Sequence, residues 1–155
     1  MSASSSSNTS ASALPVKTGP GRAAVAGWLI AGIVAASIAN AVIALIARAA
    51  GASEDFQPLQ PGAYVFFTVI GVLVGAVGWA VIRRRSTDPR ALLSWLVPTV
   101  VVVSLVPDLM MFFSDFQPHA DAAGIIGLMV MHVAVAAAAV FAYQRALPLN
   151  DAPRS

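Results

Sequence analysis

Two ionisable side chains lie inside long apolar stretches of this sequence, and they are its main candidates for chemistry. Asp108 stands five residues before the end of one stretch, and His132 stands ten residues after the start of the next. Asn40 lies in an earlier stretch, and Ser104 precedes Asp108 by about one helical turn. Ionisable groups within an apolar span are costly and mark functional candidates. Asp108 and His132 could form a proton relay or a cation site, because histidine titrates near neutral pH.

A structural role for the same residues is the alternative. Arg48 is the one basic residue expected on the outer side of the membrane, the side nearer to Asp108. Asp108 could simply pair with it. His132 could hydrogen-bond to a carbonyl or hydroxyl group between helices. If Asp108 and His132 face each other or a common cavity, the relay is favoured. If Asp108 points to Arg48, the structural role is favoured.

Other chemistries find little support in the residue types. The absence of cysteine excludes disulfides, thiolate metal sites and cysteine nucleophiles. Two histidines without a close pair of carboxylates argue against a catalytic zinc site. No serine lies in a recognisable nucleophile motif, and no basic face is interleaved with aromatic residues. We therefore expect no enzymatic activity, no metal, no cofactor and no nucleic-acid partner.

The composition places the chain in a lipid bilayer. Of its 155 residues, 58% are hydrophobic and 10% charged, whereas soluble domains carry about 25% charged residues. A chain of this length cannot bury so much apolar surface in its own core. Spanning a bilayer takes about 20 apolar residues as a helix, and lipid excludes open strands. The sequence predicts an all-α transmembrane four-helix bundle with spans at about 23–47, 63–82, 91–113 and 122–143, within a domain at 23–147 flanked by a disordered tail (1–22) and a short C-terminal tail (148–155).

The basic residues predict the orientation of the bundle. With both termini and the second connection on one side, that side holds eight of the nine Lys and Arg residues. Basic residues concentrate in cytoplasmic loops, so both termini are expected in the cytoplasm. The excess of Arg over Lys and the abundance of Ala indicate a bacterial protein, hence the inner membrane. Four arginines are expected to anchor the membrane surface, where they could also touch anionic headgroups: Arg83, Arg84, Arg85 and Arg90.

The first apolar stretch is expected to be retained as a span. Its 25 residues exceed the 7–15 apolar residues usual in a signal peptide. Small residues at 47–52 leave cleavage as an alternative. Five aromatic residues stand near predicted span ends, as aromatic side chains at a membrane interface do: Trp28, Tyr64, Trp79, Trp95 and Tyr143.

Small residues and prolines predict how the helices pack. Helices approach closely in lipid where small residues recur every three or four positions. Such packing is expected within the bundle, with a homo-oligomer or another membrane protein as alternative partner. Pro107 removes a backbone hydrogen bond just before Asp108, which predicts a kink there. The small residues form two stripes in the first span (Gly27, Ala31, Ala35, Ala39 and Gly32, Ala36, Asn40), a glycine series in the second (Gly71, Gly75, Gly78) and an alanine-rich run at 134–139.

A four-residue repeat marks the two connections on the acidic side. Asp-Phe-Gln-Pro at 55–58 recurs at 115–118, sixty residues later. The offset also aligns the second span with the fourth, as a duplicated helical hairpin would. Coincidence is the alternative explanation.

Several short motifs resemble a family of small four-span actinobacterial membrane proteins classed as a domain of unknown function. The similarity covers about 23–149. It implies the four-span architecture and draws attention to Pro107, Asp108 and His132, without implying a substrate, reaction or cofactor. The motifs are Pro61-Gly62-Ala63-Tyr64, the run 75–80, Arg83-Arg84-Arg85, Leu96-Val97-Pro98, Leu105-Val106-Pro107-Asp108, the run 128–132 and Ala146-Leu147-Pro148.

Together these features predict a non-enzymatic membrane protein with a polar pocket in the outer half of the bundle. Asn40, Asp108 and His132 are expected to line the pocket. The alternative is a proton-coupled small transporter or channel subunit that acts as a homo-oligomer, with Asp108 and His132 as relay residues.

Overall fold

The computed structural model describes residues 20–149 and is helical throughout that range, with no strand in it. Within these residues, four helical spans are long and apolar enough to cross a bilayer, which confirms the predicted fold class. The expected disordered tail falls largely at 1–19, outside the described residues. The elements are α1 (Arg22–Ala49), the 3-10 helix η1 (Gln57–Leu59), α2 (Pro61–Arg85), α3 (Pro89–Ser104), α4 (Val106–Met110) and α5 (Ala122–Ala146).

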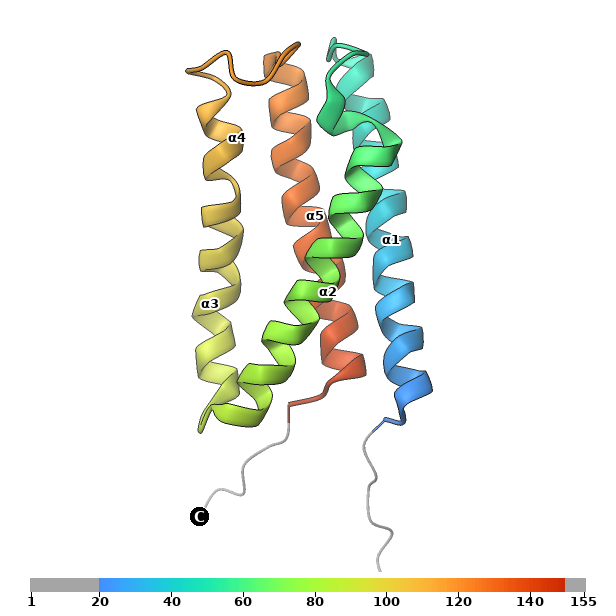
Figure 1. Ribbon diagram of the computed structural model, residues 1–155, viewed down its shortest axis with the longest axis vertical. Coiled ribbons are helices and arrows are strands. Elements are labelled where there is room, and N and C mark those ends of the chain that lie inside the picture. Colours follow the sequence, from blue (N-terminus) through green and yellow to red (C-terminus); the bar gives the residue numbers. More distant parts are fainter. Residues whose placement is uncertain (1–19, 150–155) are drawn as a thin grey trace, which may run out of the picture.

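The helices do not pack in chain order. Helix α5 lies between α1 and α3, and α2 crosses them diagonally (Figure 1). The most extensive contact joins α1 to α5, which are the first and last helices of the chain. One end of the bundle carries Arg83–Arg85 and Arg90 at the α2–α3 connection, and we call it the arginine end. The opposite end carries the connections 50–60 and 111–121, and we call it the acidic-loop end.

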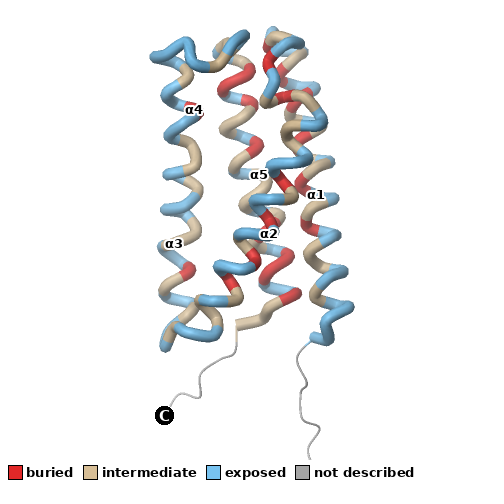
Figure 2. Tube along the Cα trace, viewed as in Figure 1, coloured by how far each residue is buried: buried red, intermediate tan, exposed pale blue. Residues whose placement is uncertain are grey.

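Small residues bring α1 and α5 into direct contact along a line that we call the seam. A Cβ on Gly32 would lie 2.7 Å from the Cβ of Ala142, and one on Gly127 would lie 2.8 Å from that of Ala47. Glycine is therefore needed near both ends of the seam. Figure 2 shows buried positions recurring along both helices. On α1 these positions are Gly32, Ala36, Asn40, Ala44 and Ala47.

Of the two small-residue stripes predicted in the first span, one is buried and the other is mostly exposed. The stripe of Gly32, Ala36 and Asn40 packs into the seam. Gly27 and Ala35 are exposed on the outer surface of the bundle instead, as is Ala31. Sequence spacing alone does not separate them, because both stripes repeat every four residues. Packing against α5 decides which one is buried.

Prolines and aspartates determine where the helices begin. Pro61 and Pro89 occupy the first positions of α2 and α3, where their missing N–H groups leave no helical bond unmade. The side chains of Asp88 and Asp121 accept hydrogen bonds from the first turns of α3 and α5. Pro107 interrupts the third span between α3 and α4, as predicted. The two pieces together form one span of 22 residues, Pro89–Met110.

The repeated Asp-Phe-Gln-Pro segments have different structures. In the first connection Phe56 is fully buried against Gly124, and a 3-10 helix follows it. In the second, Phe116 is 57% exposed in a run of turns. Asp121 ties the first connection down, because its Oδ2 accepts a hydrogen bond from the Ser53 N–H at 2.6 Å. The repeat in sequence is therefore not a repeat in conformation.

Candidate functional site

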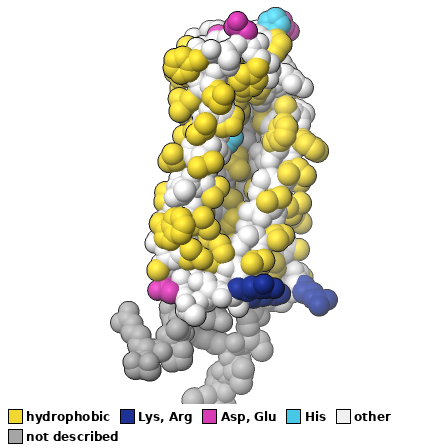
Figure 3. All heavy atoms as spheres, turned by 60° about the vertical axis from the view of Figure 1, so that its left-hand side comes forward, with side chains coloured by type: hydrophobic (Ala, Val, Ile, Leu, Met, Phe, Trp, Pro, Cys, Tyr) yellow, Lys and Arg dark blue, Asp and Glu magenta, His cyan; other side chains and the backbone are white. Residues whose placement is uncertain are grey.

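A groove of about 670 Å³ runs between α2, α3 and α5. On α2 its lining extends from Tyr64 to Ile82, which is roughly 27 Å at the helical rise of 1.5 Å per residue. That length approaches the roughly 30 Å of a bilayer's hydrocarbon core. Figure 3 shows the molecular surface hollowed between columns of hydrophobic side chains, with a histidine inside the hollow.

The groove exists because α3 stands apart from its neighbours. Helix α3 contains no glycine and is rich in valine, so it has no flat surface for close approach. On the facing side of α2, a Cβ added to Gly71 or Gly78 would meet no described atom within 4 Å. These glycines widen the groove rather than pack a helix against α2. Gly75 differs from them, because it makes room for the hydroxyl end of Tyr143.

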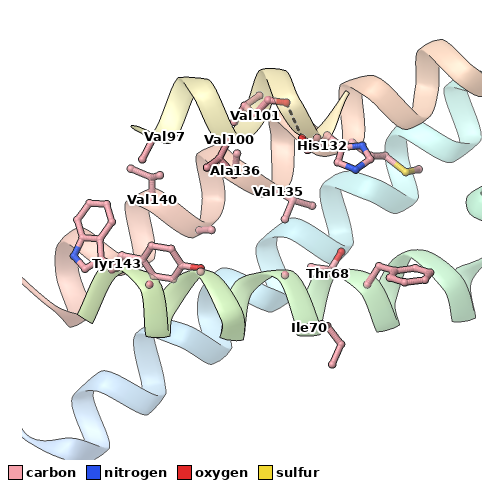
Figure 4. Close-up of a pocket in the computed structure, with 18 of the residues that line it drawn as sticks. Thr68, Ile70, Val97, Val100, Val101, His132, Val135, Ala136, Val140 and Tyr143 are labelled. Atoms are coloured by element: carbon pink, nitrogen blue, oxygen red, sulfur yellow. Dashed lines mark hydrogen bonds between the residues drawn. The ribbon is translucent and has the colours of Figure 1, made fainter. Parts of the chain in front are cut away.

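Polar side chains line one end of the groove only. Figure 4 shows His132 and Thr68 at one end of this space and Tyr143 at the other, with Val100 and Val140 between them. We call the first the polar end. Its polar lining side chains are Asn40, Tyr64, Thr68, Ser104 and His132.

Asn40 and Thr68 connect α1 to α2 at the polar end. Asn40 is 2% exposed, and its Nδ2 donates a hydrogen bond to Thr68 Oγ1 at 3.0 Å. Its carbonyl oxygen, Oδ1, is buried and has no hydrogen-bond partner in the described chain. A buried polar atom without a partner lowers the stability of the fold. Ser104 is already engaged, because its hydroxyl donates to the Val101 carbonyl at 2.7 Å.

Asp108 and His132 contact each other. The Nδ1 atom of His132 lies 3.0 Å from Asp108 Oδ2 and 3.0 Å from the carbonyl oxygen of Leu128. Hydrogen-bond geometry favours the carbonyl, so Asp108 Oδ2 touches the ring without a directed hydrogen bond. Asp108 is 3% exposed and lies behind the ring, whereas His132 lines the groove. The histidine therefore stands between the acid and the open space.

Arg48 does not pair with Asp108. Its Nη2 donates to the Leu59 carbonyl at 3.1 Å, and the described residues contain no ion pair between it and Asp108. Arg48 also does not line the groove. Of the five residues predicted for the polar site, Asn40, Ser104 and His132 meet at the groove, Asp108 supports the histidine, and Arg48 holds the first connection.

The predicted arginine anchors divide into two pairs. Arg83 donates to the Pro148 carbonyl at 3.3 Å, and Arg90 donates to the Leu149 carbonyl at 3.5 Å. Arg84 and Arg85 are exposed at the end of α2. The first pair thus holds the segment that follows α5, while the second is free to face a membrane surface.

Trp79 and Tyr143 face the interior of the bundle rather than its outer surface, which their positions near span ends did not predict. Trp79 is 5% exposed, and its Nε1 donates to the Leu147 carbonyl at 3.0 Å. The Tyr143 hydroxyl donates to the Val72 carbonyl. Both line the groove near the arginine end. Gly75 was the available signal, because a glycine facing α5 leaves room for a large ring.

The described residues contain no group of three or more His, Cys, Asp or Glu side chains that could hold a metal ion. His119 has a positive φ of 59° in the connection before α5 and takes no part in the groove.

The spans and the intramembrane groove are those of a multi-pass membrane protein. Residues 20–148 match the model of a family of unknown function (DUF6069), and the chain belongs to this family. No curated protein and no solved structure matches the chain. The family assignment covers nearly the whole described bundle, including every residue of the groove, and it attaches no activity to it.

Proposed function

We propose that this chain is a non-enzymatic protein of a bacterial inner membrane that binds a small amphiphilic molecule in the groove. The observation that carries the proposal is the uneven polarity of the groove along its length. Ligand sites are mostly apolar cavities of about 300–1,000 Å³ with a few placed polar groups. An occupant with a polar head near His132 and an apolar chain toward Trp79 would match both ends.

The same proposal includes an orientation. Basic residues concentrate at the arginine end, with Arg22 and Arg145 at the helix ends beside Arg83–Arg85. If that end faces the cytoplasm, both termini do as well, and the polar end of the groove opens toward the outer leaflet. A C-terminal reporter fusion that is active only in the periplasm would contradict this orientation.

Binding can be followed through Trp79, which lines the groove while being almost fully buried. In a background with Trp28→Phe and Trp95→Phe, a brominated alkyl amphiphile in the groove should quench Trp79 fluorescence in a saturable manner. Val100 lines the groove and Val102 on the same helix does not. Val100→Phe should therefore weaken quenching, and Val102→Phe should not. Equal quenching in the two variants would indicate unspecific lipid contact and would overturn the proposal.

A second candidate function is the proton-coupled small transporter or channel subunit. Its support is the 3.0 Å contact between His132 and Asp108 beside an open groove. The arginine-end half of the groove is walled by apolar side chains such as Val97 and Val140, which offer a proton no route. A relay would therefore need a second copy of the chain. Proton flux into liposomes tests it: flux that is absent, or equal in wild type and Asp108→Asn, rejects the relay.

A further inference from the structure

The polar end of the groove offers a hydrogen-bond acceptor to whatever occupies it. Asn40 lines this end, with its amide nitrogen bonded to Thr68 and its oxygen left without a partner in the described chain. That oxygen is itself fully buried, so it lends negative partial charge to this end of the groove without touching an occupant.

His132 supplies the acceptor that an occupant can reach. Its Nδ1 faces the Leu128 carbonyl and the Asp108 carboxyl group, both at 3.0 Å. A carbonyl oxygen can only accept, so Nδ1 carries the ring proton, and Nε2 of the neutral ring is then an acceptor. Nε2 has no hydrogen-bond partner among the described residues, and it is not fully buried. It is therefore open to an occupant.

The electrostatic surroundings favour positive charge. Asp108 is the one acidic residue inside the described spans, and it stands directly behind the His132 ring. No Lys or Arg is among the described groove-lining residues. Tyr64 and Phe67 add aromatic rings to the lining near the polar end, and such rings attract cations.

We infer that the groove takes a long-chain amine, with its ammonium group at His132 Nε2 and its alkyl chain toward Trp79. This inference rests on the proposed function and names the class of its ligand. An ammonium group supplies three donors and a positive charge, which His132 Nε2 and the carboxyl group of Asp108 complement. A fatty acid would instead bring acceptors to an acceptor and a negative charge toward Asp108. A fatty alcohol would supply one donor and no charge.

The test compares three head groups on one chain. Dodecylammonium, dodecanol and dodecanoate each compete with the brominated probe for Trp79, and Val100→Phe gives the baseline for unspecific partition. We expect dodecylammonium to compete at least about ten-fold better than the other two, since hydrogen bonds to a charged group contribute about 1.5–3 kcal/mol.

Asp108→Asn keeps the shape of the side chain and removes its charge. In this variant the preference for dodecylammonium over dodecanol should fall toward unity, while the competition by dodecanol stays unchanged. This ratio is a readout that a general loss of stability does not produce. If Asp108→Asn does not fold, Asp108→Leu tests the same point, because it removes the same charge with an apolar side chain of the same branching.

The outcomes separate the two proposals. Equal competition by the three compounds would overturn the amine inference and leave amphiphile binding standing. The tightest competition by dodecanoate would overturn it in favour of an anion site. A probe that fails to quench Trp79 saturably would overturn both, and would be expected if a second copy of the chain fills the groove.

Discussion

The two sides of α5 face neighbours of opposite character. Toward α1, the contact is made by small side chains, and Gly32 and Gly127 allow an approach that no larger residue permits. Toward α3 the facing helix is valine-rich, and within the described chain Leu93 is its one buried residue. Lipid supplies no hydrophobic force between helices, so they close only where small residues or polar bonds favour contact. The seam is closed because it has such residues, and the groove stays open because α3 lacks them.

The connections at the acidic-loop end repeat this contrast. Phe56 and Leu59 are fully buried over the seam, in a cluster with Ala47 and Met131. Phe116 and Phe113, in the connection that follows α4, are exposed. Mutations on the two sides should therefore differ in cost, even where the substitution is the same.

The largest difference is expected between the two phenylalanines of the sequence repeat. Phe56→Ala should lower the free energy of unfolding by about 3–5 kcal/mol, because it empties a fully buried site. Phe116→Ala should change it by no more than about 0.5 kcal/mol, because most of that ring is already exposed. Reversible unfolding in mixed micelles measures both values. Similar costs for the two variants would contradict the difference between the connections.

The next effect compares glycines on and off the seam. Gly127→Ala places a Cβ 2.8 Å from that of Ala47, where neither backbone can move freely. Overpacking of this kind costs about 1–3 kcal/mol. Gly27→Ala is the matched control, because a Cβ there meets no described atom within 4 Å. The same unfolding assay should show a loss for Gly127→Ala and none for Gly27→Ala; a loss for both would place α1 differently.

Helix caps give a smaller difference. Asp121 accepts from the N–H groups of Gly124 and Ser53, so it caps α5 and holds the first connection. Asp121→Ala should cost about 1–2 kcal/mol, toward the upper range for a cap. Asp88 caps α3 through Ala91 alone among the described residues, and Asp88→Ala should cost about 0.5 kcal/mol. Equal losses would mean that the bond to Ser53 adds nothing.

The smallest effect on stability is expected inside the groove. Gly71→Ala points a methyl group into open space and should leave the unfolding free energy unchanged within about 0.5 kcal/mol. Because the methyl group narrows the groove, the same variant should still weaken quenching of Trp79 by the brominated amphiphile. A stability loss comparable to that of Gly127→Ala would show that α2 and α3 pack more closely than described.

Much of the fold follows from local features of the sequence. Each span could be predicted because about 20 consecutive apolar residues have no stable place outside a bilayer. The interruption before Asp108 could be predicted as well, since Pro107 removes a helical hydrogen bond. Pro98 removes one too, and yet α3 continues through it. The observed helices extend beyond the predicted spans, for example to Ala49 and Arg85, because helices continue past the hydrocarbon region until a turn ends them.

The candidate site was only partly predictable. Asn40, Asp108 and His132 stood out because polar groups are rare in apolar spans. Their spacing could not show that Asp108 meets His132 rather than Arg48, since that choice depends on how α4 is set against α5. Nor could it show that Trp79 and Tyr143 turn inward, because aromatic residues near span ends most often face the interface.

The sequence by itself determined the number of spans, their kink and the polar residues available, because each depends on the properties of a short segment. The tertiary structure alone decided which stripe of α1 became the seam and which residues line the groove. Those outcomes depend on contacts between helices far apart in the chain, above all α1 with α5. The physical reason is that a helix in lipid has several faces of nearly equal apolarity, and only the shape of its neighbour selects among them.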